Sequence, residues 1–294
     1  MNNHQNHQGQ KSQKATHLRS LDIAFVIRGG LLALVLTLLC MAIGLIVIVA
    51  HTPFGSPPPP TPPPPTILAP AGELPSNIVA FQELLRYQGE PYVLAGSAFL
   101  LRLPDEAEES GTVIAVMTAH SMLIGDPNHP LERIALRMPG HSSPFVELDT
   151  FFGPPGHPRT GADMTVDYVL LQVSQPITPS LVLAPDPRGG PQPGERVALF
   201  SGLGSEEGKA RVLAGTVQSV NDTSVWVVMD DLFNPSMMSG SPIISQHTGQ
   251  VVGMTIAVSP RRNRLLIGFH PIASIMRHAA EAGGRTYPIE TYRP

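Results

Sequence analysis

The chain has 294 residues, 42% of them hydrophobic and 14% charged, which is long enough for one large or two small domains with a sizeable core. Its formal net charge of −4 argues against a nucleic-acid-binding role, which normally requires a basic surface. The 32 prolines and 27 glycines are typical of a turn-rich β protein rather than a helical bundle. The single cysteine, Cys40, excludes an intramolecular disulfide.

Residues 1–28 are polar and predict a disordered tail, and the apolar segment 29–50 that follows contains no charged residue. A helix of this length spans the ~30 Å hydrocarbon core of a bilayer, because each residue adds ~1.5 Å. A cleaved signal peptide is the alternative, but its apolar region usually has only about 7–15 residues. We therefore expect an uncleaved transmembrane helix.

The charges around this segment predict its orientation. No lysine or arginine follows it until Arg86, whereas four precede it: Lys11, Lys14, Arg19 and Arg28. By the positive-inside rule, we expect a single-pass membrane protein whose N-terminus is cytoplasmic and whose remaining chain is extracytoplasmic.

A proline-rich linker is expected at 51–75, because nine of the 13 residues at 53–65 are proline. Such a stretch forms an extended polyproline II rod of about 3.1 Å per residue, roughly 40 Å in all. It could dock an SH3-type module, but its predicted side of the membrane favours a spacer.

From residue 76 onward, short apolar runs alternate with Gly, Pro, Asn and Asp, which predicts an all-β barrel or sandwich. We expect a short helix at 76–87 and a second helix at 270–284, which has Pro271 near its start and Gly283 just past its end. The expected strands lie near 91–103, 111–119, 133–138, 167–173, 195–202, 210–220, 224–229, 241–245, 250–258 and 265–270.

Three short stretches carry candidate catalytic side chains. His120 follows an apolar strand in VIAVMTAHSML, Asp167 opens one in TVDYVLLQV, and Ser239 lies in NPSMMSGSPII. A serine hydroxyl needs an imidazole to take its proton, and the imidazole needs a carboxylate to hold its tautomer. Asp163 is an alternative acid, but no apolar strand follows it directly. Each residue alone has a simpler structural explanation, whereas the three together suggest nucleophilic catalysis.

The arrangement resembles the trypsin-like (chymotrypsin-fold) serine peptidases over roughly 76–282. MTAHS resembles their Thr-Ala-Ala-His-Cys motif, DYVLLQVSQPI their Asp-Ile-Ala-Leu-Leu-Lys-Leu segment, and SGSP their Ser-Gly-Gly-Pro signature. The serine at the second glycine is similar to bacterial glutamyl-endopeptidase-like and HtrA-like members, here without a PDZ domain. The resemblance implies two six-stranded antiparallel β-barrels with a C-terminal helix, forming a peptidase domain at 76–294 after the transmembrane helix.

Carried across residue by residue, the resemblance implies that His120 is the general base, Asp167 its orienting acid and Ser239 the nucleophile. Ser241 would pack the turn. The backbone N–H groups of Met237 and Ser239 would form the oxyanion hole. The family usually has glycine at the position of Met237, because the turn can demand unusual φ and ψ angles. We therefore expect backbone strain of about 1–3 kcal/mol there.

The resemblance also places the substrate pocket, with its floor at Phe233 and its wall at Thr255, Ile256 and Ala257. No carboxylate lies at the floor position, so an arginine or lysine preference is not expected. A small or apolar substrate side chain is the remaining prediction.

We therefore predict a membrane-anchored serine endopeptidase that hydrolyses protein or peptide substrates through a His-Asp-Ser triad and an acyl-enzyme, without a metal or other cofactor. The alternative is a catalytically inactive peptidase-fold binding or scaffold module anchored in the membrane, which Met237 and Met238 would favour. A third hypothesis is an envelope structural protein, in which the three triad residues would not converge in space.

Overall fold

The computed structural model describes residues 73–77, 79–104, 111–125, 129–159, 165–203, 211–261 and 263–292. All of them belong to one compact unit that spans 61–294. The predicted tail, the predicted transmembrane segment and most of the predicted linker lie outside the described residues. Within the described ranges, no helix is long and apolar enough to cross a membrane.

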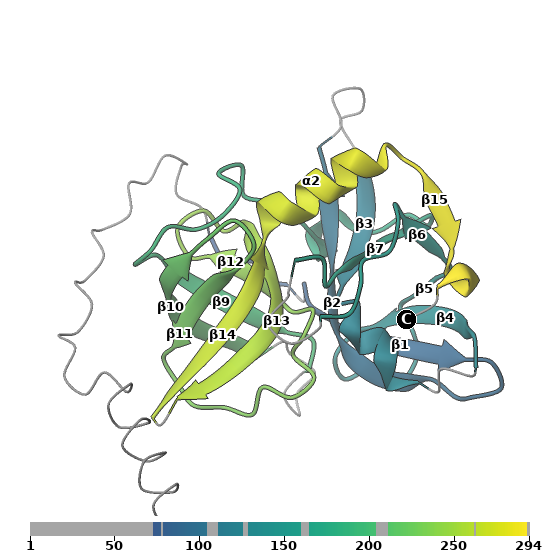
Figure 1. The fold of residues 1–294 in the computed structure, drawn as a ribbon, viewed down its shortest axis with the longest axis horizontal. Helices are drawn as coiled ribbons and strands as arrows, with labels where there is room; N and C mark the ends of the chain where they lie inside the picture. The colour runs from purple at the N-terminus through teal and green to yellow at the C-terminus, as the bar shows by residue number, and fades with distance from the viewer. Residues whose placement is uncertain are drawn as a thin grey trace, which may run out of the picture. The chain divides into compact units, whose positions relative to one another are not determined.

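The first half of the unit is a nine-stranded sheet with the order β15-β6-β7-β3-β2-β1-β4-β5, on which β8 pairs with β2 (Figure 1). The β2–β8 pairing is parallel and the others are antiparallel. The strands are β1 (Phe81–Tyr87), β2 (Val93–Leu103), β3 (Thr112–Met117), β4 (Leu131–Arg137), β5 (Val146–Leu148), β6 (Thr150–Phe152), β7 (Val169–Gln172), β8 (Val182–Leu183) and β15 (Thr286–Pro288). Three 3-10 helices accompany them, η1 (His120–Ile124), η2 (Pro179–Leu181) and η3 (Ile289–Thr291).

This sheet is not the closed six-stranded barrel that we expected. β5 is one edge and β6 lies next to the other edge, and the two are not paired with each other. Only Asp149 separates them along the chain, so a covalent connection rather than a hydrogen-bonded ladder brings the two sides of the sheet together. The sheet thereby curls around a core of its own, which includes Phe81, Leu100, Ile134 and Phe151.

The second half is a closed barrel with the strand order β10-β11-β14-β13-β12-β9, which agrees with the expectation for this half. Its strands are β9 (Arg196–Ser201), β10 (Arg211–Val220), β11 (Val225–Met229), β12 (Pro242–Ser245), β13 (Val251–Arg261) and β14 (Arg264–Pro271). Alternate residues of these strands fill the interior, among them Leu199, Val227, Ile243 and Ile267.

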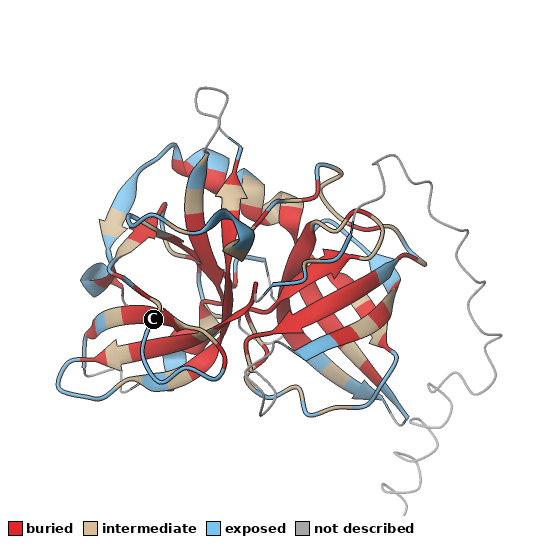
Figure 2. Ribbon diagram, turned by 180° about the vertical axis from the view of Figure 1, so that it is seen from behind, coloured by how far each residue is buried: buried red, intermediate tan, exposed pale blue. Residues whose placement is uncertain are grey.

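A third core cluster joins the two halves. It combines Phe99 and Leu170 of the first sheet with Met254 of β13 and Ile275 of α2 (Ile272–Ala282). The buried residues run continuously through this junction (Figure 2). The predicted C-terminal helix is confirmed as α2, and it ends at Gly283, whose φ of 58° is the left-handed conformation that terminates many helices.

The helix expected at 76–87 is wrong, because this segment contains the strand β1. β1 pairs with β2 on one side and β4 on the other, so it lies inside the sheet and its apolar residues do not alternate with polar ones. Without a two-residue period, the run FQELLRY also fits a helical pattern. Glu83 is fully buried in the middle of this strand.

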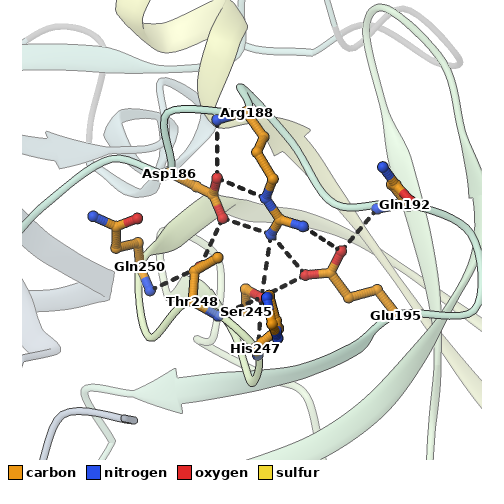
Figure 3. Close-up of polar contacts among 8 residues, drawn as sticks. All are labelled: Asp186, Arg188, Gln192, Glu195, Ser245, His247, Thr248 and Gln250. Carbon is orange, nitrogen blue, oxygen red and sulfur yellow. Dashed lines mark hydrogen bonds and ion pairs between the residues drawn. The ribbon is translucent and has the colours of Figure 1, made fainter. Parts of the chain in front are cut away.

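A buried ion-pair network fixes the segment that enters the barrel (Figure 3). Arg188 donates through Nη2 to Asp186 Oδ2 at 2.6 Å and to Glu195 Oε1 at 2.8 Å. The Thr248 hydroxyl donates to Asp186 at 2.7 Å, and the Ser245 hydroxyl donates to Glu195. The network therefore ties the connection between the two halves to the far end of β12.

Candidate functional site

The register of the first sheet brings His120 and Asp167 together. Met117, the last residue of β3, pairs with Val169, the first residue of β7, so the residues just outside both strand ends are neighbours. His120 Nδ1 lies 2.7 Å from Asp167 Oδ2, and the His120 backbone N–H donates to Oδ1 at 2.8 Å. Because an ionised carboxylate only accepts, Nδ1 carries the proton and Nε2 keeps its lone pair. Asp167 is fully buried, whereas His120 reaches solvent.

Ser239 is held between the two halves by backbone hydrogen bonds. The Ser97 N–H of β2 donates to the Ser239 carbonyl at 2.8 Å, and the Gly240 N–H donates to the Thr255 carbonyl of β13 at 2.8 Å. Gly240 has a φ of 88°, and a Cβ at this residue would stand 1.8 Å from the Ser97 carbonyl oxygen. Only glycine fits this turn, which fixes the loop that carries Ser239.

Met237 has a φ of 64°, and among the described residues it is the only non-glycine with a positive φ. The unusual backbone angle expected at this position is therefore present. The Ser97 hydroxyl donates to the Met237 carbonyl at 3.2 Å. In the described part of the chain, neither the Met237 N–H nor the Ser239 N–H donates to a backbone carbonyl.

A cavity of about 360 Å³ joins these groups. His120 and Ser239 both line it, together with Met237. Its other lining residues are Ala95, Ser121, Leu123 and Ile124. Leu123 and Ile124 are 52% and 50% exposed, so an apolar wall stands open to solvent beside the candidate nucleophile.

The residues predicted for the substrate pocket do not line this cavity. Thr255, Ile256 and Ala257 are buried in β13. Phe233 packs against the barrel core with the Arg211 guanidinium 5.5 Å from its ring centre. Their assignment to a substrate pocket stays a prediction.

Sequence reasoning missed the apolar wall and the buried acid near it. Leu123 and Ile124 lie three and four residues after His120, and this apolar pair after a candidate base was the available signal. Glu83 was hidden by the helix prediction, which would have left its carboxylate in solvent. The alternative acid Asp163 lies outside the described residues.

A second buried imidazole lies beside Asp167 but does not compete with His120. The His270 ring meets the edge of the Tyr168 ring at a centroid distance of 5.0 Å. Burial lowers the pKa of His270 to about 4, so it is neutral at physiological pH. Burial likewise raises the pKa of Tyr168 to about 12. The negative charge of Asp167 is therefore stabilised by the hydrogen bond from His120 and not by His270.

Comparison with known proteins agrees with this architecture. The trypsin-like peptidase domain matches residues 98–254, which include His120, Asp167 and Ser239. Among solved structures, Kallikrein-related peptidase 10 aligns with 15% identity over 70% of this chain and 95% of its own, with a TM-score of 0.47, a likeness too distant to argue from. No curated protein sequence matches the chain. More than half of the chain lies within the family match, and the chain belongs to the trypsin-like peptidase domain family.

Proposed function

We propose that this protein is a serine endopeptidase in which Ser239 is the nucleophile, His120 the general base and Asp167 the acid that orients it. The observation that carries the proposal is the shared cavity. An imidazole paired with a buried carboxylate lines the same cavity as Ser239 and Met237, whose N–H groups donate to no backbone carbonyl of the described residues. This combination is what acyl transfer requires.

The proposed reaction follows from these positions. Ser239 Oγ attacks the carbonyl carbon of the scissile bond while His120 Nε2 takes the hydroxyl proton. Asp167 stabilises the imidazolium, and the Met237 and Ser239 N–H groups donate to the oxyanion. The C–N bond then breaks, and His120 returns the proton to the leaving amine. Water hydrolyses the resulting acyl-enzyme through the same base. Loss of one oxyanion donor costs roughly 10²–10³ in rate, so the orientation of the Met237 amide is critical.

The cavity wall supports an apolar preference. Ala95, Leu123 and Ile124 present hydrocarbon beside His120 and Ser239, and among the described residues no acidic or basic side chain other than the His120 imidazole lines the cavity. A protein or peptide substrate with an apolar side chain near its scissile bond would bury surface here.

The N-terminal sequence supports a membrane-anchored form of this enzyme. The uncharged segment 29–50 and the lysines and arginines before it favour a single-pass anchor with the peptidase domain outside the cytoplasm. Ser-Gly-Ser-Pro at the nucleophile favours a glutamyl-endopeptidase-like or HtrA-like relationship.

A fluorophosphonate probe tests the nucleophile. The full chain, purified in mild detergent, should be labelled at Ser239, and Ser239→Ala should abolish labelling because it removes the proposed nucleophile. Ser236→Ala is the matched control: this nearby exposed serine donates its hydroxyl to Asn234, so its loss should leave labelling intact. A folded parent chain that the probe never labels would refute the proposal and favour the non-catalytic alternative.

A further inference from the structure

The hydroxyl of Ser121, the residue after His120, is buried between two oxygen atoms. Ser121 Oγ lies 2.6 Å from Glu83 Oε1 and 2.7 Å from the Thr118 carbonyl oxygen. A serine hydroxyl has one proton, and neither a carbonyl nor an ionised carboxylate can donate. Both contacts are therefore hydrogen bonds only when Glu83 is protonated. Glu83 then donates to Ser121, and Ser121 donates to Thr118.

The surroundings of Glu83 also favour the neutral acid. The side chain is 0% exposed, its Oε2 has no hydrogen-bond partner, and it forms no ion pair with any described residue. Taking a carboxylate out of water without such compensation is costly. Burial raises the pKa of Glu83 to about 8, although the Ser121 hydroxyl opposes the shift.

Glu83 lies close to both the turn that carries His120 and the backbone of Ser239. On β1 it faces Gly96 of β2, and the position of a Cβ on Gly96 would be 3.0 Å from Glu83 Oε2 and 3.0 Å from the Ser239 carbonyl oxygen. One carboxyl group therefore contacts the turn that carries His120 through Ser121 and approaches the backbone of Ser239 through the space beside Gly96.

We propose that Glu83 is a positioning residue which, as a neutral carboxylic acid, holds the His120 turn against the Ser239 loop, and that its ionisation disables the site. The inference rests on the proposed function. A deprotonated Glu83 would accept the hydrogen bond of the Ser121 hydroxyl and so withdraw it from the Thr118 carbonyl. The Thr118 carbonyl would then face a bare oxygen lone pair, and an uncompensated negative charge would lie beside the Ser239 carbonyl.

Few other titratable groups face Glu83. From η1 there is His120, next to Ser121. On its own strand is Tyr87, whose pKa burial raises and whose hydroxyl donates to the Met122 carbonyl at 2.5 Å. On β4 is Arg137, but it donates to Gln82, and neighbouring strand residues point to opposite faces. None of them supplies a cation that would hold Glu83 ionised.

The first test is the dependence of kcat/KM on pH for the full chain with a peptide substrate, from pH 6 to pH 10. We expect the parent to lose about tenfold per pH unit above roughly pH 8. In Glu83→Gln the amide still donates to Ser121 but cannot ionise, so kcat/KM should remain within about threefold of the parent at pH 7 and stay level through pH 9. Glu83→Ala should lose at least about tenfold throughout, with the loss in kcat rather than KM. An unchanged alkaline decline in Glu83→Gln overturns the proposal.

The second test needs no activity. The carboxyl of Glu83 is neutral in the fold and ionised in the unfolded chain between their two pKa values, so the parent should lose stability as the pH rises from about 5 through 8. The urea midpoint of Glu83→Gln should not fall in this way. The difference between its midpoint and that of the parent should therefore widen in favour of the variant as the pH rises over that range. Glu195→Gln is the matched control, because Glu195 is a buried acid that Arg188 keeps ionised. The difference in midpoint between this variant and the parent should not widen over the same pH range. Parallel midpoints for the parent and Glu83→Gln overturn the proposal. If the midpoint difference widens but the fluorophosphonate probe never labels the parent, the neutral state of Glu83 is supported and only the proposed function is refuted.

Discussion

The partners of two buried glutamates favour different charge states, the neutral acid for Glu83 and the ionised carboxylate for Glu195. Glu83 is fully buried with a single hydroxyl neighbour, whereas Glu195 is 3% exposed and receives hydrogen bonds from Arg188, Ser245 and the Gln192 N–H. Burial alone would raise the pKa of Glu195, but the hydrogen bonds from Arg188 and Ser245 hold it below its ordinary value. Desolvation therefore governs the first carboxyl, and ion pairing governs the second.

The backbone of Met237 offers a direct test of strain at the site. A left-handed φ costs a non-glycine residue about 1 kcal/mol, so Met237→Gly should raise the unfolding free energy by up to that amount. Met237→Val should lower it by about 1–2 kcal/mol, because a β-branched side chain tolerates positive φ least. Urea denaturation measures both changes, and the rate of fluorophosphonate labelling should fall only in the valine variant.

Met238, the neighbouring methionine, provides the control for the two Met237 variants. Met238 is 3% exposed within the barrel core, so Met238→Gly should cost about 2–5 kcal/mol through the cavity it leaves. If Met237→Gly destabilised the protein as much as Met238→Gly, side-chain packing rather than the backbone angle would explain the role of Met237.

The strand that follows the nucleophile loop, β12, is fixed at both ends. Thr255 of β13 exchanges hydrogen bonds with the nucleophile loop, accepting from Gly240 and donating to Ser241 at 2.9 Å. At the other end of β12, Ser245 joins the network of Arg188 and Glu195. The loop that carries Ser239 therefore leads into a strand that cannot slide.

Arg188→Met should lower the unfolding free energy by about 3–5 kcal/mol at pH 7, because it leaves Asp186 and Glu195 buried without their cation. Both carboxyls have pKa values held below the ordinary range when Arg188 is present. The parent therefore gains stability from them above their unfolded pKa and loses it as the pH falls through the folded values. The difference between the parent and Arg188→Met in urea denaturation should narrow in acid.

Arg196→Met is the matched control for this prediction. Arg196 pairs with Asp230 at 2.5 Å, but both side chains are 44% exposed, so solvent screens the pair and its loss should cost at most about 1 kcal/mol. Equal losses in the two variants would contradict the assignment of Arg188 as a buried anchor.

The sequence predicted the elements whose local signals agree with their surroundings. The strands of the second half and α2 follow from apolar patterns, turn residues and the glycine at 283, whereas the closed barrel was implied by the family resemblance of the motifs around His120, Asp167 and Ser239. β1 was misassigned because burial on both faces removes the period that distinguishes a strand. The opening of the first sheet depends on pairing between distant strands, and the state of Glu83 depends on Ser121, 38 residues away. Neither is visible in a local pattern.

The candidate site is assembled from residues of both the first sheet and the barrel. His120 and Asp167 lie at strand ends of the first sheet, whereas Met237 and Ser239 lie in the loop that enters β12 of the barrel. The shared core of Phe99, Leu170 and Met254 holds the halves in contact. Neither half alone carries the complete set of proposed catalytic groups.

The proposed anchor predicts how the chain is oriented in cells. With Cys40 replaced by alanine, Ser142→Cys should react with a membrane-impermeant maleimide on intact cells, because Ser142 is exposed on the peptidase domain. Ser12→Cys should react only after lysis, because the positive-inside rule places the tail in the cytoplasm. Deletion of 29–50 should release the protein from membranes washed at alkaline pH. Labelling of both cysteines from outside, or full release of the undeleted chain, would contradict the anchor.

The last described strand has a consequence for the timing of maturation. β15 pairs with β6, and Ile289 and Tyr292 after it are buried in the core of the first sheet. These residues follow the entire barrel in the chain, so a ribosome delivers them after every other part of the domain. The half that is synthesised first is thus completed last. A partly synthesised chain therefore lacks the strand β15 and the buried residues that complete its first sheet.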